Sequence, residues 1–170
     1  MTVHSAGTLP HHSYGGDSAG LVCGYLMQGS TPAMPLDSIA AAHWLQAHPQ
    51  ATPTVQGGTP LGVAAPFVWL HFNLAHAQAL RWIQRHAQLP DAFFEALKEG
   101  SHSTRIERDD DALVGVLNDA HFDFAFEPFD IATLWICVLP HVVITARAHP
   151  LRSVDALRTA VRQGYTPRSS

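Results

Sequence analysis

The chain has 170 residues, of which 46% are hydrophobic and 14% are charged, and its formal net charge is -4. These values predict one globular domain with a buried core, and they exclude a disordered chain, a collagen-like chain and a coiled coil. Fourteen carboxylates against ten basic side chains exclude a nucleic-acid partner, and the apolar runs are shorter than the roughly 18 to 20 residues of a membrane span.

The first predicted elements are a tail, a strand and a turn. Residues 1–19 contain no cationic start followed by an apolar run, which argues against a secretory signal and predicts a flexible N-terminal tail. Residues 20–27 combine β-branched, aromatic and aliphatic side chains, so they predict a strand. The turn-forming residues 28–32 end that strand.

A short helix and a long loop follow. Asp37 or Ser38 can cap a helix that ends near residue 48, because apolar side chains recur there at helical spacing. Residues 49–66 hold four prolines and three glycines with few apolar anchors, and we expect an exposed Pro/Gly-rich loop.

A strand and two helices occupy the middle of the chain. Residues 67–72 are apolar at nearly every position, which is typical of a strand covered on both faces. Asn73 is predicted to cap the next helix, and Pro90 to open a second one that Gly100 closes. The first of these helices has a predicted apolar stripe of Ala77, Leu80, Ile83 and Ala87.

After residue 100 the spacing of the apolar side chains changes from that of helices to that of strands. Residues 103–108 and 112–118 predict a hairpin with three aspartates, 109–111, at its tip. Residues 131–139 and 142–148 are long, apolar and rich in β-formers, and they predict a second antiparallel pair.

The last predicted element is an amphipathic helix over 150–164, whose Arg158 and Arg162 complement the negative end of the helix dipole. The complete order is strand, helix, strand, two helices, four strands and helix. It predicts an α/β (α+β) fold in which a mixed parallel and antiparallel sheet is sandwiched by helices. We expect residues 20–164 to form this single domain and residues 165–170 to form a C-terminal tail.

Motifs for common enzymes are lacking from the sequence. There is no GxGxxG or GxxxxGK[ST] phosphate loop, no GxSxG elbow and no HExxH pair, so we predict neither an enzyme nor a required cofactor. Cys23 and Cys137 lie singly in apolar segments, which predicts small buried side chains in a reducing compartment.

Histidine is the one compositional excess, with twelve residues. Because neutral imidazole is a common ligand of zinc and related ions, the histidines are the candidate metal ligands. His71 and His76 flank a predicted strand-to-helix junction, where α/β sheets often place ligands, and His102 lies near the acidic turn. The alternative interpretation is that scattered histidines cap elements and form surface hydrogen bonds.

Several segments, taken in order, resemble the N-terminal cytoplasmic domain of the CorA-like divalent cation transporters, in the zinc transporter ZntB branch. The resemblance covers about residues 21–163. It includes the segment 21–36 (LVCGYLMQGSTPAMPL) as an opening strand and turn, and it continues through four later features. These are Trp69-Leu70-His71 before a helix, Leu89-Pro90 at the start of a helix, Thr104 to Glu107 in a strand, and the closing run VLPHVVITARAHPLRSVDAL.

This resemblance implies an α/β/α sandwich that forms the wall of a cytoplasmic funnel. The funnel belongs to a homo-pentamer that transports Zn²⁺ or Mg²⁺. It places the full-length protein at the cytoplasmic face of the inner membrane. The 170 residues contain no stalk, no pair of membrane helices and no Gly-Met-Asn motif. We therefore expect the membrane to be reached only through a missing C-terminal part, and no ion-selectivity residue is carried over.

Two alternatives belong to other classes. A free-standing histidine-rich protein that binds or buffers metal would have tight stoichiometric sites, whereas a funnel domain predicts weak binding, so a zinc titration separates them. An enzyme with a pocket at the junction of His71 and His76 would need a polar cleft there.

Overall fold

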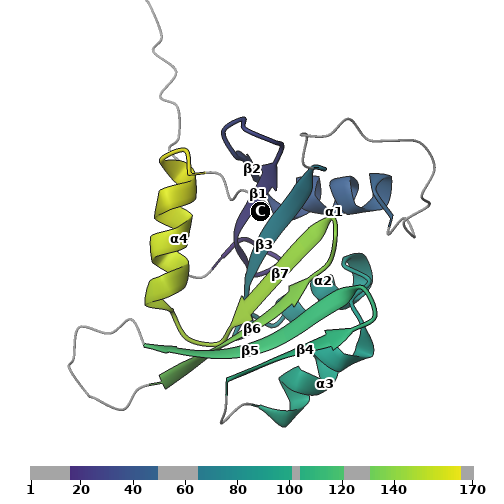
Figure 1. Ribbon diagram of the computed structural model, residues 1–170, viewed down its shortest axis with the longest axis vertical. Coiled ribbons are helices and arrows are strands. Elements are labelled where there is room, and N and C mark those ends of the chain that lie inside the picture. Colours follow the sequence, from purple (N-terminus) through teal and green to yellow (C-terminus); the bar gives the residue numbers. More distant parts are fainter. Residues whose placement is uncertain (1–15, 50–64, 101–103, 121–130, 166–170) are drawn as a thin grey trace, which may run out of the picture.

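Helices cover both faces of a seven-stranded sheet in the computed structural model of the chain (Figure 1). The structure describes residues 16–49, 65–100, 104–120 and 131–165. The strand order is β2-β1-β3-β7-β6-β5-β4. In chain order the elements are β1 (Leu21–Met27), β2 (Met34–Leu36), α1 (Ser38–Ala47), β3 (Phe67–Asn73), α2 (Ala79–His86), α3 (Asp91–Glu99), β4 (Arg105–Asp109), β5 (Ala112–Ala120), β6 (Ile131–Val138), β7 (Val142–Arg147) and α4 (Arg152–Arg162).

The sheet is mixed, as the order of predicted elements required. Strands β3 and β7 run parallel, with Val68 opposite Val142 and Asn73 opposite Arg147. The other neighbouring pairs of the described strands are antiparallel, including the predicted hairpins β4–β5 and β6–β7. The predicted fold class, a mixed sheet sandwiched by helices, is therefore confirmed.

Alternation along the strands divides the core into two layers. On β3, the side chains of Val68, Leu70 and Phe72 face α1, α2 and α3, whereas Trp69 faces α4. In Figure 1, α4 (yellow) lies on one side of the sheet and the other three helices lie on the other side. Both faces of β3 are thus buried, which accounts for its nearly continuous apolar sequence.

The start of the fold is fixed by two aspartates. Asp37 caps α1, since its Oδ1 accepts a hydrogen bond from the Ala40 N–H at 2.8 Å, as one of the two predicted caps would. Asp17 Oδ1 accepts from the Leu21 N–H at 3.0 Å, and its Oδ2 accepts from the Ser38 N–H at 3.1 Å. Asp17 therefore ties the beginning of β1 to the beginning of α1, so residues 16–19 are part of the fold and not of the tail.

The predicted start of α2 was wrong. Asn73 ends β3 instead of capping a helix, and its Oδ1 accepts from the Ala75 N–H in a turn. The helix starts six residues later, after Gln78. Half of the predicted stripe is confirmed, since Ile83 and Ala87 are buried. Ala77, however, precedes the helix and Leu80 is 41% exposed, and Ala79 is buried in addition.

Strand β2 was not predicted at all. Its three residues pair with β1, with Gly24 opposite Leu36, and they form the edge of the sheet. Most of the Pro/Gly-rich loop, residues 50–64, lies outside the described residues, as do residues 121–130. Among the described helices, none combines the length and the apolar character that crossing a bilayer requires.

Candidate functional site

His71, the first of the predicted metal ligands, lies in β3 between β1 and β7. It is 1% exposed, and its register partners are Cys23 on β1 and Thr145 on β7. The His71 Nδ1 and the Thr145 Oγ1 are 2.9 Å apart, and the Trp69 indole N–H donates to the same hydroxyl at 2.9 Å. His71 Nε2 has no hydrogen-bond partner among the described residues.

The surroundings of His71 hold its imidazole in the neutral form. Burial lowers the pKa of His71 to about 3, and the positive charges of Arg147 and Arg158 act in the same direction. Neutral imidazole can ligate a metal, but the same two guanidinium groups repel a cation. Near His71, the side chains of Arg147 and Arg158 therefore carry positive charge, while His71 itself is uncharged.

The other two predicted ligands lie elsewhere. His76 is half-buried in the turn before α2, where its Nδ1 accepts from the Gln78 N–H at 3.3 Å. It packs against Gly20, because a Cβ on that glycine would lie 2.9 Å from the His76 Cβ. His102 lies outside the described residues. A role of His71, His76 or His102 in metal binding thus stays a prediction.

Histidines in other parts of the described fold pack against tryptophans. His48 and His141 stack on Trp44 with ring centroids 4.2 and 6.4 Å away, and His86 lies 4.8 Å from the Trp82 ring. Burial, together with the neighbouring His48, lowers the pKa of His141. No three side chains of His, Cys, Asp or Glu converge as metal ligands within the ranges that the structure describes.

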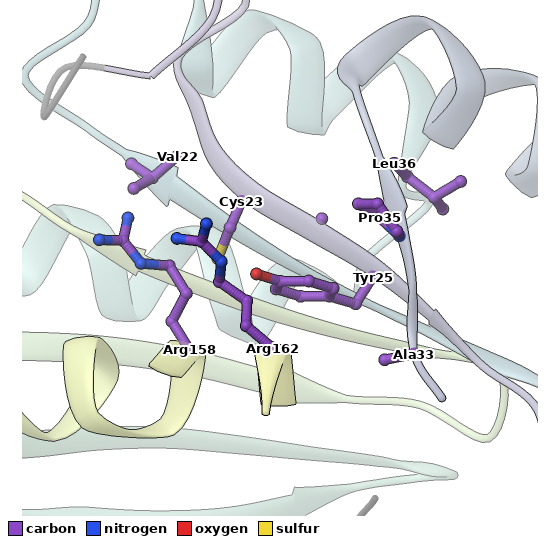
Figure 2. A pocket seen from close by; sticks show the side chains of 9 residues that line it. Val22, Cys23, Tyr25, Ala33, Pro35, Leu36, Arg158 and Arg162 are labelled. Carbon is purple, nitrogen blue, oxygen red and sulfur yellow. The ribbon is translucent and has the colours of Figure 1, made fainter. Parts of the chain in front are cut away.

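A hollow of about 530 Å³ opens between α4 and the β1–β2 edge of the sheet. Its floor and walls come from both strands, from the turn before β2 and from two turns of α4. The lining residues are Val22, Cys23, Gly24, Tyr25, Ala33, Pro35, Leu36, Arg158 and Arg162. Figure 2 shows the two arginine side chains extending from α4 toward β1, and the Tyr25 hydroxyl pointing toward their guanidinium groups.

The two arginines of this hollow differ in their partners. Arg158 Nη2 lies 3.2 Å from Asp155 Oδ1, one turn earlier on α4. No carboxylate in the described part of the chain pairs with Arg162. From the sequence, both side chains are expected only to complement the end of the helix dipole, because nothing in the local sequence shows that this face of α4 lies toward β1.

Cys23 and Tyr25 supply uncharged polar groups to the hollow. Burial raises the pKa of the Cys23 thiol to about 12, so this sulfur is protonated at neutral pH and is a poor nucleophile. Burial also raises the pKa of Tyr25, and the neighbouring Cys23 adds to this effect, so its hydroxyl remains a hydrogen-bond donor. Tyr25 is held by stacking on Trp69, with ring centroids 5.8 Å apart.

The chain matches a protein family and a curated relative. The family described as CorA-like Mg²⁺ transporter protein matches residues 64–170. The zinc transport protein ZntB of Pectobacterium carotovorum subsp. carotovorum (strain PC1) is 22% identical over 102 residues, which are 60% of this chain and 31% of that protein. The chain therefore spans about a third of the length of this relative.

Solved structures share the fold at low sequence identity. The structure of the full-length CmaX protein superposes with a TM-score of 0.66 at 22% identity, over 90% of this chain and 42% of that one. The cytoplasmic domain of ZntB from Vibrio parahaemolyticus RIMD 2210633 superposes with a TM-score of 0.59 at 19% identity, over 89% and 53% of the two chains. The mixed sheet with helices on both faces is therefore a fold that these proteins have in common.

Proposed function

The chain belongs to the family of CorA-like Mg²⁺ transporter proteins, and from this premise we propose that it is the cytoplasmic domain of a transporter of divalent cations, Zn²⁺ or Mg²⁺. The observation that carries the proposal is the family match over residues 64–170, which is more than half of the chain. The resemblance found in the sequence is thereby confirmed at the level of the CorA/ZntB family.

The fold supports the assignment to a cytoplasmic domain. A similar fold occurs in the structure of a ZntB cytoplasmic domain. The chain covers 42% of full-length CmaX and 31% of the ZntB relative, so most of the length of a transporter of this kind lies beyond the matched part. In this proposal the domain expected over residues 20–164, extended by residues 16–19, is the cytoplasmic domain, and residues 165–170 lead to a stalk and a membrane segment.

The physical task of such a domain is to guide cations. Five copies would surround a funnel at the cytoplasmic face of the membrane, and a formal net charge of -4 on each copy raises the local concentration of divalent cations. Steering of this kind works through the summed field of many carboxylates, so it needs no tight site. Binding of the ion by one chain is therefore expected to be weak.

Transport is tested on the complete gene product that contains these residues. Reconstituted in liposomes with an internal metal-sensitive dye, it is expected to admit Zn²⁺ or Mg²⁺ down a concentration gradient, while empty liposomes do not. Absence of flux for both cations in a correctly inserted protein would contradict the proposal.

Zinc titration of the 170-residue chain tests the metal-buffering alternative. We expect no tight one-to-one site, because the described residues hold no cluster of three ligands and because Arg147 and Arg158 oppose a cation at His71. The comparison protein carries His71→Ala, His76→Ala and His102→Ala together. A stoichiometric site that this variant loses would show that these histidines ligate zinc, and it would favour a free-standing metal buffer.

A further inference from the structure

The hollow between α4 and the β1–β2 edge concentrates positive charge in a protein whose net charge is negative. Arg158 and Arg162 lie four residues apart on α4, which puts them on the same side of the helix, one turn from each other. Both side chains line the hollow and extend toward β1 (Figure 2). Asp155 offsets the charge of Arg158. Arg162, by contrast, has no paired carboxylate in the described ranges.

A third arginine adds to this field from the sheet. Arg147, on β7, is 4% exposed, and it is close enough to His71 and Cys23 to influence the pKa values of both. Neighbouring like charges on one face of a helix are unfavourable. An anion placed between the two guanidinium groups would relieve this repulsion, and each guanidinium offers a planar fork of N–H donors to oxygen atoms.

The opposite side of the hollow is apolar. Pro35 and Leu36 of β2 and the ring of Tyr25 line it, and in Figure 2 they lie beyond the hydroxyl of Tyr25 on the side away from the arginines. The volume of about 530 Å³ falls in the usual range for small-molecule sites, and it is far larger than an inorganic ion needs. A ligand that fills the hollow must therefore combine an anionic head with an apolar or aromatic body.

We propose that this hollow binds a small organic phosphate, with the phosphate group between Arg158 and Arg162 and its apolar or aromatic body against Tyr25, Pro35 and Leu36. A phosphate monoester presents three oxygen atoms and close to two negative charges, so it can engage both guanidinium groups and the Tyr25 hydroxyl together. A single carboxylate satisfies only one arginine fork in the bidentate manner.

Calorimetric titration of the metal-free 170-residue chain with phenyl phosphate tests the proposal, with inorganic phosphate as the second probe. Phenyl phosphate is expected to bind one-to-one and more tightly than inorganic phosphate, because only the ester also covers the apolar wall. Arg162→Gln is expected to weaken binding by about tenfold or more, since it removes a charge-assisted contact, and Arg158→Gln should act in the same direction.

The matched control is Arg152→Gln, which removes one exposed positive charge from the same helix but does not line the hollow. It should change the affinity less than twofold, and Tyr25→Phe should reduce the affinity while keeping the aromatic wall. Binding that is absent for both probes, or that Arg152→Gln weakens as much as Arg162→Gln does, would overturn the site. Equal affinity for the two probes would overturn the organic part of the ligand and leave an ion site only.

Discussion

Acidification is expected to destabilise the domain through His71. Burial, reinforced by Arg147 and Arg158, lowers the pKa of His71 from its ordinary 6.5 to about 3. Between these two pH values the unfolded chain holds a proton that the folded chain does not, so the free energy of unfolding falls as the pH falls. The stabilising contribution is fully present above about pH 6.5, and its loss reaches about 3 kcal/mol at pH 4.

Urea unfolding at a series of pH values between 4 and 8 measures this effect. In His71→Gln the extra pH dependence below about pH 6.5 should disappear, because an amide does not titrate yet can still bond to Thr145. His43→Gln, which replaces an exposed histidine on α1, is the matched control and should retain the wild-type slope. A His71→Gln protein with the wild-type slope would show that His71 is not the buried neutral group described.

Phe72→Ala is expected to lower the free energy of unfolding by about 3–5 kcal/mol. Phe72 is 0% exposed in the inner strand β3, and its ring centroid lies 5.0 Å from that of Trp82 on α2. The change removes the side chain and leaves a cavity between the sheet and a helix that cannot close fully around it. Since small domains are stable by about 5–15 kcal/mol, this single loss is a large share of the total.

Chemical denaturation followed by tryptophan fluorescence measures this loss. If Phe72→Ala does not fold, the free energy of unfolding is measured on Phe72→Leu instead, with an expected loss of about 1–2 kcal/mol. Ile106→Ala on β4 is the control, because Ile106 is 64% exposed, and it should change the free energy by no more than about 0.5 kcal/mol. Similar losses at positions 72 and 106 would contradict the burial of Phe72.

The parts of the fold that were predictable are those with a local signal. The apolar run of β3, the hairpin β6–β7 and the Asp37 cap all depend on residues close together in the chain. Strand β2 has three residues, one of them proline, and its place comes only from pairing with β1. Asn73 gives the signal of a helix cap, but pairing of β3 with β7 extends the strand through this residue. Tertiary pairing overrides local preference in both cases.

The same limit applies to the candidate site. The sequence singled out His71, but its hydrogen-bond partner Thr145 lies 74 residues away and reaches it only because β3 and β7 are parallel neighbours. Asp17 and Ser38, 21 residues apart, meet for a similar reason. The hollow under Arg158 and Arg162 was not predicted, because a helical pattern tells which face of α4 is apolar but does not tell which strands that face will cross.

The parallel pairing of β3 with β7 also sets the order in which the strand pairs can form during synthesis. The hairpins β4–β5 and β6–β7 close over short loops and can assemble quickly, whereas β3 must wait for a partner whose first paired residue, Val142, is 74 positions beyond Val68. During synthesis, the edge of β3 that pairs with β7 therefore stays unpaired until β7 has left the ribosome. An unpaired strand edge is a template for pairing with other chains, so the nascent chain is exposed to aggregation during that interval.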